Sequence, residues 1–199
     1  MSEIFFEHWF PTIISYSFYN GHNNLVDTLV NRCYTIKDNT NSGGINWISS
    51  ETYNTSDGMY DVFLDEHFEP LNSWVDSQVA KYCENLKIAG DIARHNSWFN
   101  IYKENDYQEI HTHPRSTVSA IYCLAGEENS AEIYFKSPKQ DMFDVRYQEF
   151  TNDNHSIVKY PFQPGKLLIF LSDTAHSVGK HSLQTDRISV SYNYIQVPQ

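Results

Sequence analysis

The second half of the chain alternates short apolar runs with turn residues. From residue 97 onward, β-branched and aromatic residues gather in short stretches that Gly, Pro, Asn and Asp separate. Such stretches are typical of β-strands. Eight of them in succession predict a β-sandwich or jelly roll. We expect the strands at residues 98–103, 108–113, 117–124, 131–136, 157–160, 166–171, 175–179 and 187–195.

The first half carries two stretches of helical periodicity. From an N-cap at Asn23 or Asn24, apolar residues recur every three or four positions as far as Ile36, which predicts a short amphipathic helix. A longer apolar stripe ends at Leu86, and Pro70 before it suits the first turn of a helix. Both helices are expected to support one face of the β-structure.

These patterns predict one domain over residues 1–199. Residues 1–96 would supply an N-terminal strand and the supporting helices, and residues 97–196 would form the β core. Residues 4–18 have an extended pattern and offer an edge for pairing with a second copy, which predicts a homodimer. The polar segment 137–155 is too long for a tight hairpin. It is either a lid over a site or a mobile insertion.

Composition narrows the partners and the compartment. The chain has 14 basic and 25 acidic residues, a net charge of -11, and such a chain repels phosphate backbones. Nucleic acid is therefore disfavoured as a partner. The three cysteines are widely separated and fit reduced thiols better than disulfides. No secretory signal or membrane-spanning apolar run is visible, so we expect a cytoplasmic protein with no membrane partner.

The candidate chemistry centres on three histidines. His111 and His113 are two positions apart on a predicted strand, and their side chains therefore point to the same side of it. His176, from a distant strand, could complete a three-cornered metal site, because imidazole suits iron, zinc, copper and nickel. A pair of strand histidines satisfied by hydrogen bonds would give the same local pattern, so the histidines alone do not decide.

The strand that begins at Arg187 strengthens the hypothesis of a metal site. Its polar residues fall on one face and its apolar residues on the other. That polar face either meets solvent or lines a cavity, where the guanidinium would pair with a carboxylate of an acidic co-substrate. The polar face consists of Arg187, Ser189, Ser191 and Asn193.

Taken together, the motifs resemble one enzyme superfamily in their order and spacing. The chain is similar to the Fe(II)/2-oxoglutarate-dependent oxygenases, and within them to the 2OG-Fe(II) oxygenases of phages and marine bacteria related to prolyl 4-hydroxylases. The likeness is dense from Ser97 to Ile195 and loose before that. The motifs that carry it are Asn100-Ile-Tyr102, His111-Thr-His113-Pro114, Ser119-Ala-Ile-Tyr122, Pro164 to Phe170, His176-Ser-Val178 and Arg187-Ile-Ser189.

The resemblance implies a mainly β fold with flanking helices, a double-stranded β-helix (jelly roll) whose open end holds Fe(II). His111 would be the proximal ligand and His176 the distal one. Arg187, helped by Ser189, would anchor the far carboxylate of 2-oxoglutarate. Other positions that would line the co-substrate pocket are Asn100, Tyr102 and Tyr122, with Ser119 facing the opposite way from Tyr122.

One position departs from the superfamily's commonest pattern. His-x-Asp or His-x-Glu is usual there, and this chain has His113 in place of the carboxylate. We interpret His113 as the third metal ligand, a trait of the subfamily. A water molecule or a carboxylate from elsewhere, such as Asp173, is the alternative.

The predicted function is oxidative decarboxylation of 2-oxoglutarate coupled to hydroxylation of a substrate by O2. The substrate, a small molecule or a peptidyl group, cannot be inferred from the sequence. Two alternatives are kept. One is a cupin-like dioxygenase with three histidine ligands that does not use 2-oxoglutarate. The other is a β-sandwich binding module without turnover.

Overall fold

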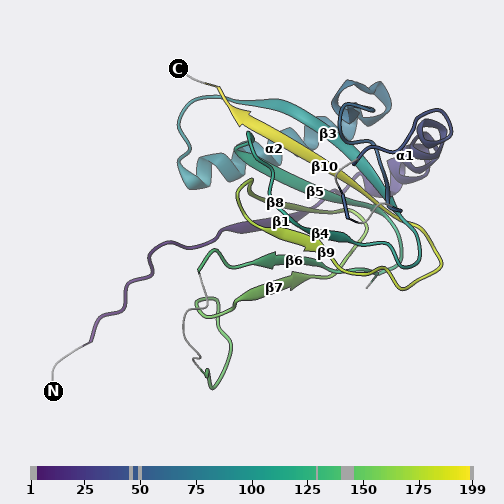
Figure 1. Ribbon diagram of the computed structural model, residues 1–199. Helices are drawn as coiled ribbons and strands as arrows, with labels where there is room; N and C mark the ends of the chain where they lie inside the picture. The colour runs from purple at the N-terminus through teal and green to yellow at the C-terminus, as the bar shows by residue number, and fades with distance from the viewer. Residues whose placement is uncertain (1–3, 45–46, 49–50, 129, 140–145, 198–199) are drawn as a thin grey trace.

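Two antiparallel sheets form the body of the protein (Figure 1). The computed structural model describes residues 4–44, 47–48, 51–128, 130–139 and 146–197. The larger sheet has the strand order β1-β8-β5-β10-β3-β2, and the smaller one the order β4-β9-β6-β7. The larger sheet comprises β1 (Ile14–Phe18), β2 (Tyr53–Asn54), β3 (Ile92–Tyr102), β5 (Val118–Ala125), β8 (Lys166–Leu171) and β10 (Arg187–Gln196). The smaller comprises β4 (Gln108–His111), β6 (Ile133–Lys136), β7 (Ile157–Tyr160) and β9 (His176–Val178).

Two α-helices cover the outer face of the larger sheet, as the apolar stripes predict. They are α1 (His22–Lys37) and α2 (Glu69–Leu86). The N-cap of α1 is Gly21, so the predicted cap at Asn23 or Asn24 is wrong by two or three residues. Pro70 lies in the first turn of α2, where a missing N–H costs nothing. Two short 3₁₀ helices, η1 (Val62–Leu64) and η2 (Glu66–Phe68), lead into α2.

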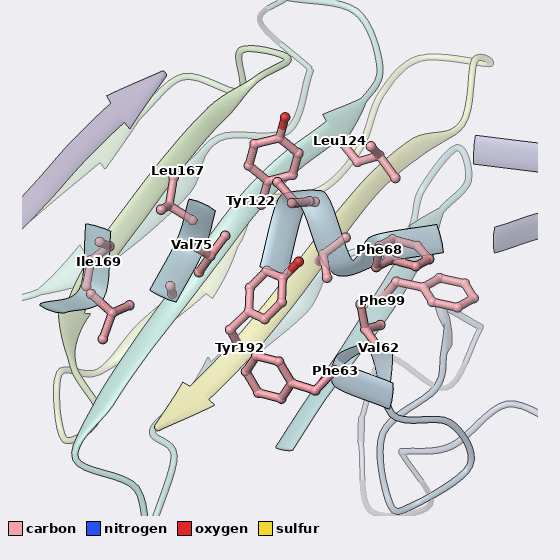
Figure 2. Packing of buried hydrophobic residues seen from close by; sticks show 14 of the residues in the cluster. Val62, Phe63, Phe68, Val75, Phe99, Tyr122, Leu124, Leu167, Ile169 and Tyr192 are labelled. Carbon is pink, nitrogen blue, oxygen red and sulfur yellow. The ribbon is translucent and has the colours of Figure 1, made fainter. Parts of the chain in front are cut away.

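The two faces of the larger sheet differ: the outer face is apolar, and the inner face carries both apolar and polar buried side chains. Its outer face packs with the helices into the main core, where Tyr122, Leu167 and Tyr192 gather around Val75 and Phe68 (Figure 2). Its inner face looks toward the smaller sheet. This division follows from strand alternation, which sends neighbouring residues to opposite faces. On β10 the polar residues Arg187, Ser189, Ser191 and Asn193 take the inner face and are buried there, so they line the interior and do not meet solvent.

The eight predicted strands of the second half all exist, with ends that differ by a few residues. The largest difference is at β3, which begins at Ile92. No pattern predicted β2, a pair of residues that bonds to β3. In the predicted extended segment 4–18, only Ile14–Phe18 forms a strand, and the residues before it project from the body (Figure 1). Part of the segment 137–155, residues 140–145, lies outside the described residues, so its role as lid or insertion stays a prediction. No helix among the described residues has the length and apolar character needed to cross a membrane.

Candidate metal and co-substrate site

Three histidines from three segments converge between the two sheets. His111 ends β4 and pairs in register with His176, the first residue of β9. His113 follows β4 outside the strand, and its backbone N–H donates to the Ser172 carbonyl at 2.9 Å. Potential ligand atoms of the three rings lie within 4.8 Å of one another. Of the residues described, no carboxylate belongs to this cluster, and Asp173, the alternative ligand, is exposed.

Hydrogen bonds fix the orientation of each ring. The Nδ1 atom of His111 lies 2.8 Å from the Glu109 carbonyl, and that of His176 lies 3.0 Å from the Thr174 carbonyl. A carbonyl oxygen can only accept, so both rings carry their proton on Nδ1. Their Nε2 atoms then carry free lone pairs, the form in which histidine binds a metal.

Burial keeps the three rings neutral. It lowers the pKa of His111, and it lowers that of His176 well below the ordinary value. For His113, burial and the neighbouring His111 lower the pKa to about 4. The Nε2 atom of His113 is buried and has no hydrogen-bond partner among the residues that the structure describes. At neutral pH the cluster therefore presents unprotonated nitrogen atoms that a metal ion can bind.

Arg187 is a buried cation that makes no hydrogen bond of normal geometry to the described residues. Its side chain is 0% exposed, no carboxylate pairs with it within the part of the chain that the structure describes, and the Tyr102 hydroxyl lies close enough to attract its charge. The guanidinium lies between the rings of Tyr102 and Phe162, with its Cζ 4.7 Å and 4.5 Å from their centroids. The ring faces hold the cation by cation–π attraction but do not satisfy its N–H donors. A carboxylate would satisfy them through two parallel hydrogen bonds.

Between Arg187 and the histidines, the inner face of the larger sheet carries polar side chains. Ser189 pairs in register with Asn100, and Ser191 with Trp98. The Asn100 amide makes only long contacts of 3.5 Å and 3.4 Å to the two serine hydroxyls, and its Oδ1 is buried without a partner. Burial raises the pKa of Tyr102 to about 12, so its hydroxyl keeps its proton. This surface offers donors and acceptors along the path from the guanidinium to the histidines.

The sequence matches a protein-family model described as "Putative 2OG-Fe(II) oxygenase" over residues 96–193. The chain belongs to this family of 2OG-Fe(II) oxygenases. It is thus a 2-oxoglutarate-dependent oxygenase that uses Fe(II) and 2-oxoglutarate, and the resemblance inferred from the motifs is confirmed.

Solved structures with the same fold include three enzymes of low sequence identity. A prolyl-4-hydroxylase from Pseudomonas putida superposes with a TM-score of 0.65 at 15% identity, covering 94% of each chain. HygX from Streptomyces hygroscopicus, solved with nickel and 2-oxoglutarate, gives 0.63 at 8% identity, covering 94% of this chain and 84% of its own. A prolyl hydroxylase from Trichoplax adhaerens gives 0.59 at 14%, covering 91% and 83%. Among curated proteins, none matches the sequence. These likenesses confirm the double-stranded β-helix fold.

The residues of this 2OG-Fe(II) oxygenase fit its metal and co-substrate. Three neutral imidazoles with free Nε2 atoms suit Fe(II), and an unpaired guanidinium suits a dicarboxylate. The structure brings together seven of the eight site residues expected from the sequence. They are His111, His113, His176, Arg187, Ser189, Asn100 and Tyr102.

The eighth, Tyr122, does not lie in the site. It packs in the helix-facing core of Figure 2, and its hydroxyl lies 2.8 Å from Nδ1 of His22. The prediction that Tyr122 binds the co-substrate is therefore wrong. The inner face of β5 carries Ser119, Ile121 and Cys123 instead, since Ser119 pairs with Asn193 and Cys123 with Ser189.

Three aromatic residues next to the site were missed. Trp98 lies 5.4 Å, between ring centroids, from His113, and its buried Nε1 has no partner. Trp98 lies on the same face of β3 as Asn100 and Tyr102, so the two-residue period of the strand could have predicted its place in the site. Phe162 covers Arg187, and Phe135 stacks on His176 at 5.9 Å. No pattern marks Phe162, because it lies outside the strands.

A groove of about 560 Å³ runs between the segment before β1 and the residues around β6 and β7. The three histidines do not line it, but Phe135, which does, also stacks on His176. The segment before β1 forms the opposite wall. Both apolar and charged residues line the groove, among them Trp9, Phe10, Ile14, Lys136, Val158 and Tyr160.

Proposed function

We propose that His111, His113 and His176 bind Fe(II) through their Nε2 atoms, and that Arg187 binds the far carboxylate of 2-oxoglutarate. The observation that carries this proposal is the guanidinium of Arg187, which is fully buried and makes no hydrogen bond of normal geometry to the described residues. Burying an unpaired charge costs several kcal/mol. A chain keeps such a group only where a ligand supplies the missing partner.

The neighbours of Arg187 would shape the co-substrate pocket. Tyr102 and Phe162 hold the guanidinium between their rings and keep water from its faces. Ser189 and Asn100 lie next along the same face and would donate to the co-substrate. Excluding water strengthens the ion pair that the carboxylate would form.

The metal supplies the redox chemistry: with O2, 2-oxoglutarate is oxidised to succinate and carbon dioxide, and a substrate C–H bond is hydroxylated. The protein's part is orientation and exclusion of water. The two carbonyl acceptors of Glu109 and Thr174 hold the His111 and His176 rings with Nε2 toward the metal.

The groove beside Phe135 is the proposed entrance for the substrate. Phe135 separates the groove from His176, and the groove's volume of about 560 Å³ suits a small molecule or a short peptidyl segment. The mixed lining does not choose between these two classes.

Compartment and assembly also stay proposals. Cys33, Cys83 and Cys123 are buried free thiols, which supports a role in the reducing cytoplasm. The edge strand β1 supports pairing with a second copy, since its outer edge bonds to no other described strand. The net charge of -11 supports a partner other than nucleic acid.

Anaerobic loading tests the proposed site. The purified protein is mixed with Fe(II) and then 2-oxoglutarate, and a weak visible charge-transfer band is expected, followed by succinate once air is admitted. His176→Ala should abolish the band by removing a ligand, and Arg187→Ala should weaken it by lowering co-substrate affinity. A wild-type protein that binds neither iron nor 2-oxoglutarate would contradict the proposal. Turnover that is indifferent to Arg187→Ala would favour a three-histidine dioxygenase that does not use 2-oxoglutarate.

A further inference from the structure

The three histidines differ in what holds their Nδ1 atoms. His111 and His176 each use a backbone carbonyl two residues earlier in the chain. His113 uses side chains: its Nδ1 lies 2.6 Å from Oδ1 of Asn193 and 2.9 Å from Oγ of Ser119. Any residue at positions 109 and 174 would supply the two backbone acceptors. The acceptor for His113 depends on which residues occupy positions 193 and 119.

We propose that Asn193, with Ser119, is the positioning residue of the third metal ligand: its side-chain carbonyl holds the proton of His113 on Nδ1 and so leaves Nε2 free for Fe(II). This inference rests on the proposed function, since it assumes that His113 binds the metal. A carboxylate ligand at position 113 would not need such a residue, because it has no ring tautomer to fix.

The hydrogen bonds around Asn193 form a consistent series of donors and acceptors. The Nδ2 atom of Asn193 donates to Oδ1 of Asn96 at 2.9 Å, which turns Oδ1 of Asn193 toward His113. Ser119 also donates to that Oδ1, at 2.7 Å, and Ser172 lies 2.8 Å from Ser119, where it can donate in turn. Each donor atom in this network then has an acceptor, and the Nδ1–H of His113 points at a carbonyl oxygen.

The opposite orientation of the Asn193 amide would have the opposite result. Its Nδ2 would face His113 and donate to Nδ1, so the ring proton would move to Nε2 and block the metal. In the structure Asn96 presents its Oδ1 to Nδ2 of Asn193, which favours the first orientation. The tautomer of His113 is therefore the quantity that decides the proposal.

The side-chain hydrogen bonds around Asn193 also hold His113 in place of the strand hydrogen bonds that it lacks. His113 lies outside β4, so no strand ladder fixes its backbone, which makes only the bond to Ser172 and a long turn bond from Ser116 among the described residues. Ser119, Ser172 and Asn193 are almost fully buried and come from β5, the end of β8 and β10. Buried and fully satisfied networks of this kind are rigid. The ring is thus held against the larger sheet, while His111 and His176 are held on the smaller one.

Metal titration of the apoprotein provides one test. Fe(II) under anaerobic conditions, and Co(II) as a spectroscopic probe, are titrated into wild type and variants by calorimetry and absorbance. Asn193→Leu should weaken binding about 10- to 100-fold, the usual effect of losing a group that orients a ligand. Asn193→Asp keeps an acceptor and should retain affinity near that of wild type. Tyr122→Phe, on the helix-facing side of the larger sheet and outside the site, is the control and should bind metal as wild type does.

A second measurement does not depend on any variant folding. Long-range ¹H–¹⁵N correlation of the wild-type apoprotein at neutral pH should show His113 with its proton on Nδ1. A proton on Nε2 would overturn the proposal, as would a folded Asn193→Leu variant that binds metal like wild type. Failure of the wild type itself to bind metal would instead refute the proposed function. The two failures are therefore distinguishable.

Discussion

Asp65 and Arg187 are both buried ionisable residues, and the chain treats them in opposite ways. The carboxylate of Asp65 accepts hydrogen bonds from Arg32, at 2.8 Å, from Tyr60, and from the backbone N–H of His67, at 2.9 Å. The three nitrogens of Arg187 make no hydrogen bond of normal geometry to the described residues. The charge of Asp65 is therefore paired within the chain, whereas the charge of Arg187 needs a bound ligand as its partner.

The difference separates stability from function. A buried charge with partners in the chain ties segments together, and here Asp65 joins α1 to the residues before α2. A buried charge without such partners lowers the stability of the fold, and a protein retains it where it binds a ligand. The comparison predicts that removing Asp65 will harm folding and spare binding, and that removing Arg187 will do the reverse.

The largest effect is expected for Arg187→Leu. Removing one partner of a buried ion pair costs about 2–5 kcal/mol of binding, which is roughly a 30- to 5,000-fold loss of 2-oxoglutarate affinity. Calorimetric titration of the Fe(II)-loaded protein measures it. The unfolding free energy should stay the same or rise, because an unpaired buried charge has been replaced by an apolar side chain.

Arg187→Lys is the matched control for that experiment. Lysine keeps the charge but lacks the planar fork, so affinity should fall between those of wild type and Arg187→Leu. Unchanged affinity in Arg187→Leu would show that the guanidinium does not bind the co-substrate. A large loss of stability would show that it has a structural partner after all.

Asp65→Ala should have the opposite result. It leaves the donors of Arg32, Tyr60 and His67 without their acceptor. Because Arg32 is partly exposed and regains water, we expect about 2–3 kcal/mol of lost unfolding free energy, below the value for a fully buried pair. Urea unfolding measures this loss. Metal and 2-oxoglutarate affinity of the folded variant should match wild type, and a loss of affinity at full stability would break the comparison.

The pH dependence of stability sharpens the role of Asp65. Burial alone would raise the pKa of Asp65, but hydrogen bonds from Arg32, Tyr60 and His67 outweigh it and lower the pKa from 3.8 to about 2. The unfolded chain therefore binds the proton first. The stabilisation is complete above pH 3.8 and is lost as the pH falls toward 2.

Acid unfolding of wild type and Asp65→Asn measures this contribution by difference. The unfolding free energy of wild type should fall more steeply over that range, because the variant has no carboxyl group to titrate at position 65. Parallel curves for the two proteins would show that the pKa of Asp65 is not lowered by its partners.

Much of this arrangement was predictable, because alternation along a strand is a strong signal where one face is polar. The alternation along β10 grouped Arg187, Ser189 and Asn193 on one face, and the motif order then favoured a cavity over solvent for that face. To predict that His111 lies next to His176, it was enough to expect their two strands to be neighbours. The three-histidine cluster follows from these patterns together with the motif order.

The features that were not predicted depend on how strands pair and where loops run, and the local sequence does not show either. Every residue of β5 from Val118 to Leu124 is buried, so polarity does not tell which face is inner. Only the pairing of Ser119 with Asn193 decides it, and that pairing is long-range. Phe162 reaches Arg187 from outside any strand, and β2 is too short to show a period. Asn23 was a plausible helix cap by residue type, but the chain turns at Gly21 instead.

The smallest expected effect distinguishes the two faces of the larger sheet. Tyr122→Phe removes a hydroxyl that contacts His22 on the helix side, and should cost about 1 kcal/mol of stability with no change in 2-oxoglutarate affinity. Tyr102→Leu, on the inner face, removes a ring that holds the Arg187 guanidinium and should weaken 2-oxoglutarate binding severalfold. The same titration and unfolding measurements apply to both. If Tyr122→Phe lowered co-substrate affinity as much as Tyr102→Leu, the two faces of the sheet would not divide packing from binding.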